Sequence, residues 1–239
     1  MRLDVYLTEN GLCRSRSAAQ SLINAGGVLV NGKPALKNSR DVTEADRVAV
    51  IDEKIPKYVG RGGLKLEHAL ERWSIDLSGA LCVDIGASTG GFTDCMLQNG
   101  AAKVFAVDVG REQLDEKLRA DSRVVSLEQT DIRDFTLPDT PADFVGTDVS
   151  FISLKLVLPH VYRLLKSGGT AVALIKPQFE AGQQNLNKKG IVRSESARLK
   201  CVKEVEESAV MCGFAHIGTE QSPITGGDGN IEYLLALKK

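Results

Sequence analysis

The run 84–93 combines an acid with three glycines, a pattern that could hold a charged small molecule. Its glycine spacing is not the Gly-x-Gly-x-x-Gly pattern that binds a pyrophosphate. Asp84 precedes the glycines and would meet a phosphate badly but a cationic ligand well. The run therefore favours S-adenosylmethionine as the cofactor, although an ordinary glycine-containing turn stays open. The residues expected to bind it here are Asp84, Gly86, Ser88, Thr89, Gly90, Gly91 and Phe92.

Further acids and one lysine fall where successive strands of an expected parallel sheet end. They are Asp84, Asp108, Asp131, Asp148 and Lys176. Ligands of such sheets bind outside the carboxyl ends of the strands, so these side chains should line one pocket. Asp108 stands at about the offset from Asp84 at which an acid accepts hydrogen bonds from ribose hydroxyls, and Asp131 could bind the adenine amino group. Each alone is a commonplace loop acid.

The elements that would position these residues alternate regularly from residue 81 onward. Five parallel strands are expected at 81–84, 103–108, 123–127, 143–147 and 170–175. Helices are expected from residue 92, around 112–120, over 154–166 and over 194–211. Two more β-favouring runs, 214–218 and 231–237, would close the sheet as a hairpin. The pattern predicts an α/β fold with a doubly wound seven-stranded sheet, and a closing hairpin of this kind is what the sheets of Rossmann-like class I methyltransferases add.

The first 52 residues predict a separate small α+β module. A short helix or turn near residue 3 is followed by a helix that Ser15 or Ser17 could cap, and Asn31-Gly32 signals a tight hairpin. Residues 1–40 carry a net charge of +4. This order resembles the RNA-binding domain named after a ribosomal small-subunit protein, also found on pseudouridine synthases. The resemblance implies phosphate contacts from Arg14, Arg16, Lys33 and Lys37.

A second basic stretch, 176–203, includes Lys188 and Lys189 and has a net charge of +5. Both stretches would suit a polyanionic partner, and solvated helix faces are the equally plain alternative. Tyr6 is the only aromatic residue of the first module, so structured RNA recognised by its backbone is a better partner than stacked single strands. Between the modules, the charged and proline-containing segment 53–63 predicts a linker, and the second domain is expected over 64–239.

Composition limits the other classes of function. The chain has 239 residues and a net charge of −1, with five scattered cysteines and no Cys-x-x-Cys pair. Neither a disulfide framework nor a zinc site is predicted, the three histidines lie far apart, and no metal is expected. The sequence predicts neither a signal peptide nor a membrane span. A cytoplasmic monomer is the simplest expectation.

Four stretches taken together resemble one family over nearly the whole chain. They are 61–66, 84–93, 148–154 and 176–180, supported by 229–233. The family is the TlyA family of two-domain ribosomal RNA methyltransferases, whose catalytic domain is of the FtsJ type. The resemblance implies methyl transfer from S-adenosylmethionine to a ribose 2′-hydroxyl, typically of cytidine, in ribosomal RNA or ribosomal subunits. It also implies that the N-terminal domain positions the RNA.

The family's catalytic set falls on Lys65, Asp148, Lys176 and Glu232. A ribose hydroxyl is a weak nucleophile at neutral pH, so it needs a positioned base or a cation that stabilises the developing alkoxide. We assign Lys176 to the hydroxyl, with Lys65 orienting the nucleotide and Glu232 holding one lysine in place. Which lysine is neutral stays open, and Asp148 is also expected near the cofactor.

Three alternatives come from other classes. Older names in this family include haemolysin, so a membrane-active protein is one, although no amphipathic basic helix with aromatic anchors is predicted. A non-catalytic RNA-binding scaffold that keeps S-adenosylmethionine is the second. A nicotinamide-dependent oxidoreductase is the third, and it would need glycines that suit a pyrophosphate.

Overall fold

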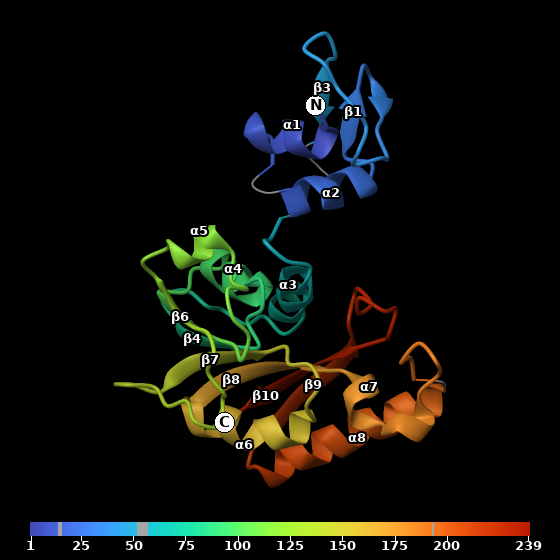
Figure 1. Cartoon of the computed structure of the whole chain (residues 1–239). Coiled ribbons are helices and arrows are strands. Elements are labelled where there is room, and N and C mark those ends of the chain that lie inside the picture. Colours follow the sequence, from blue (N-terminus) through green and yellow to red (C-terminus); the bar gives the residue numbers. More distant parts are fainter. Residues whose placement is uncertain (14–15, 52–56, 193) are drawn as a thin grey trace. The chain divides into compact units, whose positions relative to one another are not determined.

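The computed structural model describes residues 1–13, 16–51, 57–192 and 194–239 (Figure 1). The chain forms two compact units, Met1–Lys57 and Tyr58–Lys239. Most of the expected linker's first half lies outside the described residues, and its second half belongs to the second unit. The domain limits 1–52 and 64–239 stay predictions.

The first unit packs two helices against a small antiparallel sheet. Its helices are α1 (Leu3–Glu9) and α2 (Arg16–Asn24), and its strands are β1 (Val28–Val30), β2 (Lys33–Pro34) and β3 (Val48–Val50), in the order β2-β1-β3. Leu3, Leu7, Leu22 and Ile23 from the helices are buried with the strand residues. Asn31 and Gly32 both have positive φ, 54° and 75°, which confirms the predicted tight hairpin. Ser15 and the side chain of Ser17 lie outside the described part, so the expected N-cap is untested there.

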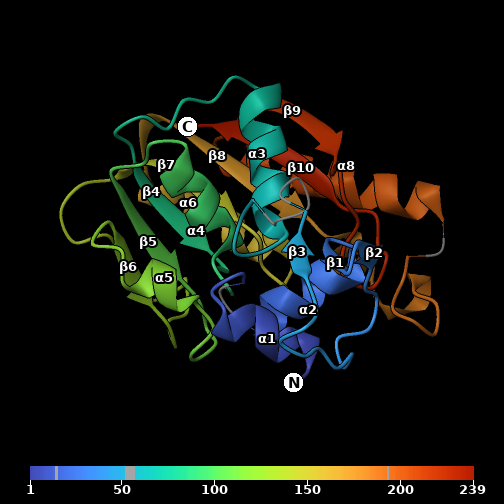
Figure 2. The same ribbon diagram turned by 90° about the horizontal axis from the view of Figure 1, so that it is seen from above.

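The second unit is built on a seven-stranded sheet in the order β6-β5-β4-β7-β8-β10-β9 (Figure 2). The strands are β4 (Leu81–Ile85), β5 (Lys103–Val107), β6 (Val124–Leu127), β7 (Ala142–Thr147), β8 (Leu165–Ile175), β9 (Ala215–Gln221) and β10 (Tyr233–Lys238). β4 to β8 pair in parallel, whereas β10 runs antiparallel between β8 and β9. The seven-stranded, doubly wound sheet is confirmed.

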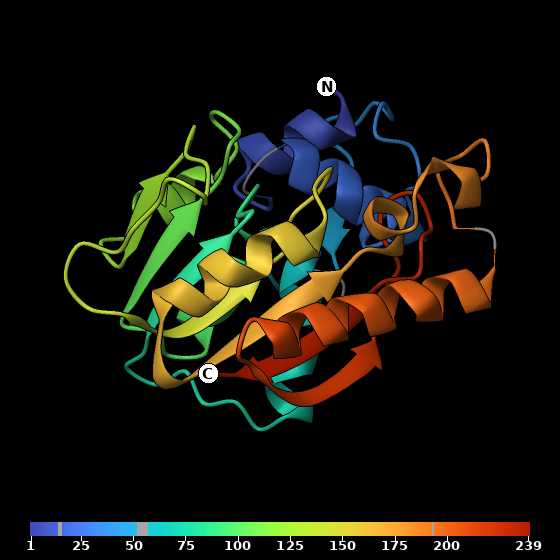
Figure 3. The same cartoon turned by 90° about the horizontal axis from the view of Figure 1, so that it is seen from below.

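Helices cover both faces of this sheet. α3 (Gly62–Arg72), α4 (Gly91–Gln98) and α5 (Glu116–Arg119) lie on one face, and α6 (Leu154–Leu164) and α8 (Glu195–Met211) on the other (Figures 1 and 3). Side chains along β8 alternate between the two cores: Val172 packs with the α3–α4 face and Ala173 with the α6–α8 face. No helix in the described segments is long and apolar enough to cross a bilayer.

The prediction of a helix over 112–120 is wrong in its length, since only the four residues of α5 are helical. The carboxylate of Glu128 accepts hydrogen bonds from the backbone N–H groups of Glu112, Gln113 and Leu114, at 2.5, 2.8 and 3.0 Å. These three N–H groups therefore donate to a side chain that follows β6, and Glu112 has a positive φ of 54°. A tertiary contact therefore replaces the first turns of that helix.

Two short elements after β8 were not predicted. α7 (Pro177–Glu180) begins with proline in its first turn, where the missing N–H costs nothing, and a 3₁₀ turn follows at Gln183–Asn185. The helix expected at 154–166 ends at Leu164, because β8 begins at the next residue. These elements place the segment that follows Ile175 beside the end of the sheet.

Candidate active site

Two adjoining cavities open at the carboxyl ends of the parallel strands. The larger has a volume of about 490 Å³ and the smaller about 200 Å³. Both are lined by Gly86, Ser88, Asp148 and Ser150, so the end of β4 and the segment after β7 separate them. The larger cavity also has an apolar floor that includes Val107, Ile132 and Val157. An apolar slot beside a polar one suits a ligand with a flat ring and a charged tail.

Two glycines of the 84–93 run let other parts of the chain pack closely against their backbone. Gly86 has φ 81°, and a Cβ there would lie 2.6 Å from the carbonyl oxygen of Asp148. Gly90 has φ 96°, and a Cβ would meet the side chain of Leu118 at 2.2 Å. Only glycine adopts these conformations without strain. Thr89, Gly91 and Phe92 line the smaller cavity, whereas Gly90 lines neither.

Asp108 and Asp131 both line the larger cavity, as expected from their strand-end positions. The carboxylate of Asp108 accepts hydrogen bonds from the backbone N–H groups of Ser88 and Gly110, each at 2.7 Å, and so links two strand-end loops. Asp131 is paired with Arg133 at 2.6 Å, and the hydrogen bond from that guanidinium lowers the pKa of Asp131 to about 2. Both acids keep acceptor capacity toward the cavity.

Asp84 lines neither cavity and is completely buried beneath them. Its Oδ2 accepts from the backbone N–H of Thr93 at 2.9 Å and from the Thr93 hydroxyl at 2.6 Å, whereas its Oδ1 has no hydrogen-bond partner. Burial raises the pKa of Asp84 to about 7; the bonds from Thr93 act against this, and the charge of Asp148 adds to it. Asp84 thus ties the first turn of α4 to β4, one layer below the pocket.

The four residues of the catalytic set come together from four separate elements. Nζ of Lys65, on α3, donates to Glu232 at 2.7 Å and lies 3.9 Å from Oδ2 of Asp148. Nζ of Lys176, at the end of β8, lies 2.6 Å from Oδ1 of the same aspartate. The result is an alternating chain of charges, Glu232, Lys65, Asp148 and Lys176. Lys176 and Asp148 also line the smaller cavity.

Burial differs along this chain of charges. Lys65 and Glu232 are almost fully buried, at 7% and 3% exposure, whereas Lys176 and Asp148 face the cavity. A buried lysine is tolerable only when it is paired, and the 2.7 Å bond to Glu232 supplies that pairing. Lys65 is therefore held as a fixed charge, and Lys176 is the cation of this chain of charges that a ligand in the cavity could reach.

Three residues of the site went unnoticed in the sequence. Ser150 accepts a hydrogen bond from Nζ of Lys176 at 2.8 Å. Glu180 accepts from the backbone N–H of Leu154 and the hydroxyl of Ser153, both at 2.6 Å, and so joins α7 to the start of α6. Phe151 has φ 63° and is 91% exposed beside the pocket. Ser150 and Phe151 lie in the run 148–154 and Glu180 ends the run 176–180, but the sequence assigned a role to none of them.

The expected RNA-binding residues divide between the two units. Arg14 lies outside the described residues, Arg16 pairs with Asp4, and Lys33 and Lys37 are exposed. Lys188 and Lys189 are exposed on a loop of the second unit. That loop is fixed to the segment before β10, because the buried side chain of Asn230 accepts from the N–H of Val192 and donates to the carbonyl of Gly190.

The helical half of the second basic stretch behaves differently. On α8, Lys200 and Lys203 lie 3.9 and 3.8 Å from Glu204 and Glu207, one turn further on. Such pairs are typical of a solvated helix face. None of the five cysteines forms a disulfide bond, and the described part of the chain holds no group of three or more histidine, cysteine or acidic residues placed to bind a metal.

Comparison with known proteins gives a match for each unit. Residues 58–239 match the family model described as FtsJ-like methyltransferase, and residues 1–48 match the S4 domain. The chain is 43% identical to Hemolysin A of Brachyspira hyodysenteriae, over 98% of both chains. It is 41% identical to the 16S/23S rRNA (cytidine-2′-O)-methyltransferase TlyA of Mycobacterium tuberculosis, over 99% of this chain and 89% of that one. A solved structure of a hemolysin-named protein from Streptococcus thermophilus has a TM-score of 0.78 and 45% identity, covering 100% of this chain and 88% of the other.

Proposed function

This chain belongs to the TlyA family, with an S4 domain followed by an FtsJ-like methyltransferase domain, and we propose that it methylates the ribose 2′-hydroxyl of a cytidine in ribosomal RNA. The methyl donor is S-adenosylmethionine, as for the methyltransferase fold in general. The observation that carries the proposal is the alternating chain from Glu232 to Lys176, in which Asp148 and Lys176 line the smaller cavity. Such a chain presents one reachable cation to a hydroxyl group.

The residues of the two cavities fit the proposed cofactor. The larger cavity offers an apolar floor for adenine, with Asp108 placed to accept from ribose hydroxyls and Asp131 from an amino group. The smaller cavity is lined by Asp148 beside the cations Arg61 and Lys176, so the carboxylate of Asp148 is the group there that could face a sulfonium or ammonium group. Close backbone approach at Gly86 lets the two cavities adjoin. When bound, S-adenosylmethionine supplies an electrophilic methyl group on a sulfonium with a good neutral leaving group.

Lys176 is assigned to the substrate hydroxyl. Its ammonium is held between Asp148 and the hydroxyl of Ser150, so it is oriented before substrate arrives. From that position it can receive the hydroxyl proton when neutral, or stabilise the developing alkoxide when charged. Lys65 cannot take this part, because Glu232 and Asp148 surround its ammonium and burial separates it from solvent. Lys65 and Glu232 instead fix Asp148 in place.

Three further parts of the proposal concern partners and location. The S4 domain carries exposed Lys33 and Lys37 and would bind structured RNA through its phosphates. Free ribosomal RNA or ribosomal subunits are the proposed substrates, because the Mycobacterium tuberculosis relative is named for 16S and 23S rRNA. We place the enzyme in the cytoplasm, acting as a monomer. A membrane-lytic role, suggested by the name of another relative, would require neither the chain of charges nor the cavities.

The proposal is tested with methyl-labelled S-adenosylmethionine and, in parallel, free ribosomal RNA, separated subunits and assembled ribosomes. The labelled RNA is digested to nucleosides, and label is expected in 2′-O-methylcytidine. Lys176→Ala should abolish labelling while RNA and cofactor binding persist. Lys155→Ala is the matched control, because it removes a lysine paired with Glu204 on the α6–α8 surface and should leave labelling unchanged.

The other outcomes separate the alternatives. Label in a base keeps the cofactor but overturns the assignment of Lys176 to a ribose hydroxyl. No label in any RNA, despite tight cofactor and RNA binding, supports the non-catalytic scaffold. Binding of a nicotinamide cofactor in place of S-adenosylmethionine supports the oxidoreductase alternative.

A further inference from the structure

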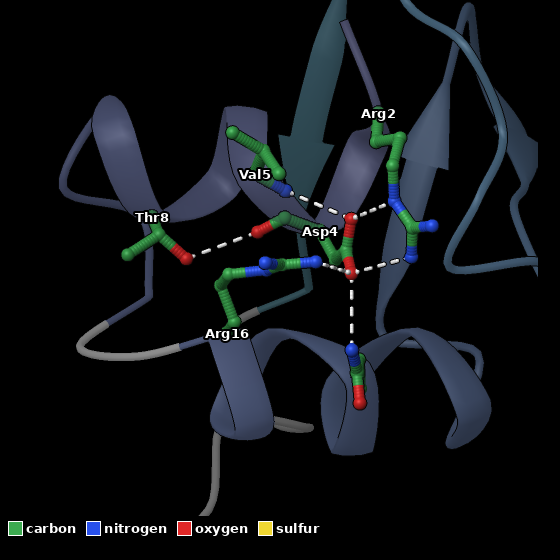
Figure 4. Close-up of polar contacts among 6 residues, drawn as sticks. Arg2, Asp4, Val5, Thr8 and Arg16 are labelled. Carbon is green, nitrogen blue, oxygen red and sulfur yellow. Dashed lines mark hydrogen bonds and ion pairs between the residues drawn. The ribbon is translucent and has the colours of Figure 1, made fainter.

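One carboxylate in the first unit gathers hydrogen bonds from both of its helices. Asp4, on α1, accepts from Arg2 through two nitrogens, Nε to Oδ1 at 3.0 Å and Nη2 to Oδ2 at 2.9 Å (Figure 4). Oδ2 also accepts from Nη2 of Arg16 at 3.4 Å and from the amide of Gln20 at 3.0 Å, both on α2. The backbone N–H of Val5 donates to Oδ1 at 3.1 Å. The carboxylate therefore has five donors, and it fixes α1 to α2.

Burial is unequal within this cluster. The Asp4 side chain is completely buried, whereas the side chains of Arg2 and Arg16 are 47% and 57% exposed. The hydrogen bonds from Arg2, followed by that from Gln20, hold the pKa of Asp4 well below its usual range. Asp4 is thus a permanent anion that solvent does not reach, and the two cations cover it on the surface.

The charges in the cluster do not cancel. One carboxylate meets two guanidinium groups, which leaves a surplus positive charge at the surface, and Asp41 adds only a weaker attraction toward Arg2. Arg2 uses one edge of its guanidinium on Asp4, and Arg16 uses a single nitrogen. Each guanidinium has five N–H donors in a rigid plane, which is more than the Asp4 carboxylate accepts from it.

We propose that Asp4 is a positioning residue that holds Arg2 and Arg16 as a preformed pair for phosphate groups of the RNA backbone. The inference rests on the proposed RNA substrate and adds Arg2 to the residues expected to bind it, with Asp4 acting only through the two arginines. A free arginine side chain loses rotamer freedom when it binds, and one already held by a buried carboxylate has lost that freedom on folding. Asp4 thereby strengthens the binding of an anion although it is itself an anion.

Because Asp4 is an anion, positioning and simple electrostatics predict opposite changes in RNA affinity when its charge is removed. Asp4→Asn removes a negative charge, so simple electrostatics predicts tighter RNA binding, whereas loss of positioning predicts weaker binding. In the full-length protein without cofactor, we expect affinity for ribosomal RNA to fall about tenfold. The slope of log affinity against log salt concentration should become shallower by about one to two, since phosphate contacts are lost. Glu44→Gln, the same charge change at an exposed acid of the same unit, is the matched control and should not weaken binding.

Two further variants keep the test decisive if Asp4→Asn disturbs folding, which thermal unfolding will report. Arg2→Lys keeps the charge and the pairing with Asp4 but loses the two-nitrogen contact, and affinity should fall several-fold. In a protein that already carries Arg2→Ala and Arg16→Ala, adding Asp4→Asn should reduce RNA affinity little further. At saturating RNA, kcat of Asp4→Asn should match the unchanged protein, with the loss confined to KM.

Affinity that is unchanged or increased in folded Asp4→Asn, or unchanged in Arg2→Lys, overturns the inference. An equal loss from Asp4→Asn with and without the arginines also overturns it, because the acid would then act by another route. These binding measurements need no methyl transfer. An unchanged protein that binds RNA without methylating it therefore contradicts the proposed function alone, and one that binds no RNA contradicts both.

Discussion

Lys176 is held against Asp148 with Nζ and Oδ1 2.6 Å apart, and the other oxygen of the same carboxylate faces Lys65. Asp148 therefore orients the reachable lysine and connects it to the buried one. Asp148→Asn keeps the shape of the side chain but removes the charge that both lysines face.

We expect Asp148→Asn to lower kcat by at least about a hundredfold, the size of a lost general acid–base arrangement, with little change in KM for RNA. Turnover is measured at saturating cofactor, because Asp148 also lines the cavity. Asp139→Asn, which removes an acid from another loop of the same unit, is the control. Activity within threefold of the unchanged protein would show that the carboxylate is not needed.

A second prediction concerns the close approach at Gly86. Gly86→Ala places a methyl group against the carbonyl of Asp148 at a positive φ, so both stability and cofactor affinity should fall, the latter at least about tenfold. Gly79→Ala is the matched control, since Gly79 has φ 70° with nothing within 4 Å of the added Cβ. It should cost only about 1 kcal/mol of stability and leave cofactor binding unchanged. Calorimetric titration and denaturant unfolding measure both effects.

The buried Asp84 predicts an unusual pH dependence of stability. Its pKa is raised from 3.8 to about 7 in the folded chain, so its contribution to stability is fully present below pH 3.8 and is lost as pH rises through 7. Asp84→Asn mimics the neutral acid and keeps an oxygen for both bonds from Thr93. Relative to the unchanged protein without cofactor, this variant should gain on the order of 4 kcal/mol of unfolding free energy between pH 4 and pH 8.

Denaturant unfolding at a series of pH values measures that gain. The exposed Asp76 supplies the control, because hydrogen bonds from Ser78 lower its pKa and it is ionised throughout the upper part of this range. Asp76→Asn should leave the pH dependence above pH 5 unchanged. Parallel curves for Asp84→Asn and the unchanged protein would mean that Asp84 is ionised in the fold.

A fourth prediction separates the two halves of the basic stretch. Replacing Lys188 and Lys189 together with glutamine should weaken RNA binding about tenfold and reduce its salt dependence, while cofactor affinity stays the same. Replacing Lys200 and Lys203 with glutamine removes equal charge from residues paired along α8 and should have little effect. Equal losses for the two double variants would indicate general attraction rather than contact through the loop.

The sheet was predictable from sequence because its strands are continuous apolar runs between turn residues. Alternate residues of β8 pack on opposite faces, so the whole run from Thr170 to Ile175 had to be apolar or small. The helix expected around residue 112 failed for the converse reason. The carboxylate of Glu128, which follows β6, fixes the conformation of residues 112–114. No local sequence pattern predicts such a contact.

The candidate site shows the same division. Asp108, Asp131 and Lys176 were found from their places at strand ends, and they line the cavities. Lys65 and Glu232 entered only through resemblance to a family, since each lies outside the parallel strands. The burial of Asp84 and the sharing of Asp148 between two lysines depend on packing in three dimensions, which spacing along the chain does not encode.

The bond between Lys65 and Glu232 spans 167 positions, from α3 to the residue before β10. During synthesis the first of these residues leaves the ribosome long before the second. All residues that line the two cavities precede Lys176 or include it, so they can be in place while the buried lysine still lacks its partner. Until Glu232 is in place, the buried lysine has only the more distant carboxylate of Asp148, at 3.9 Å, to balance its charge. The geometry of the charge chain therefore depends on the last strand of the chain, β10, which lies between β8 and β9.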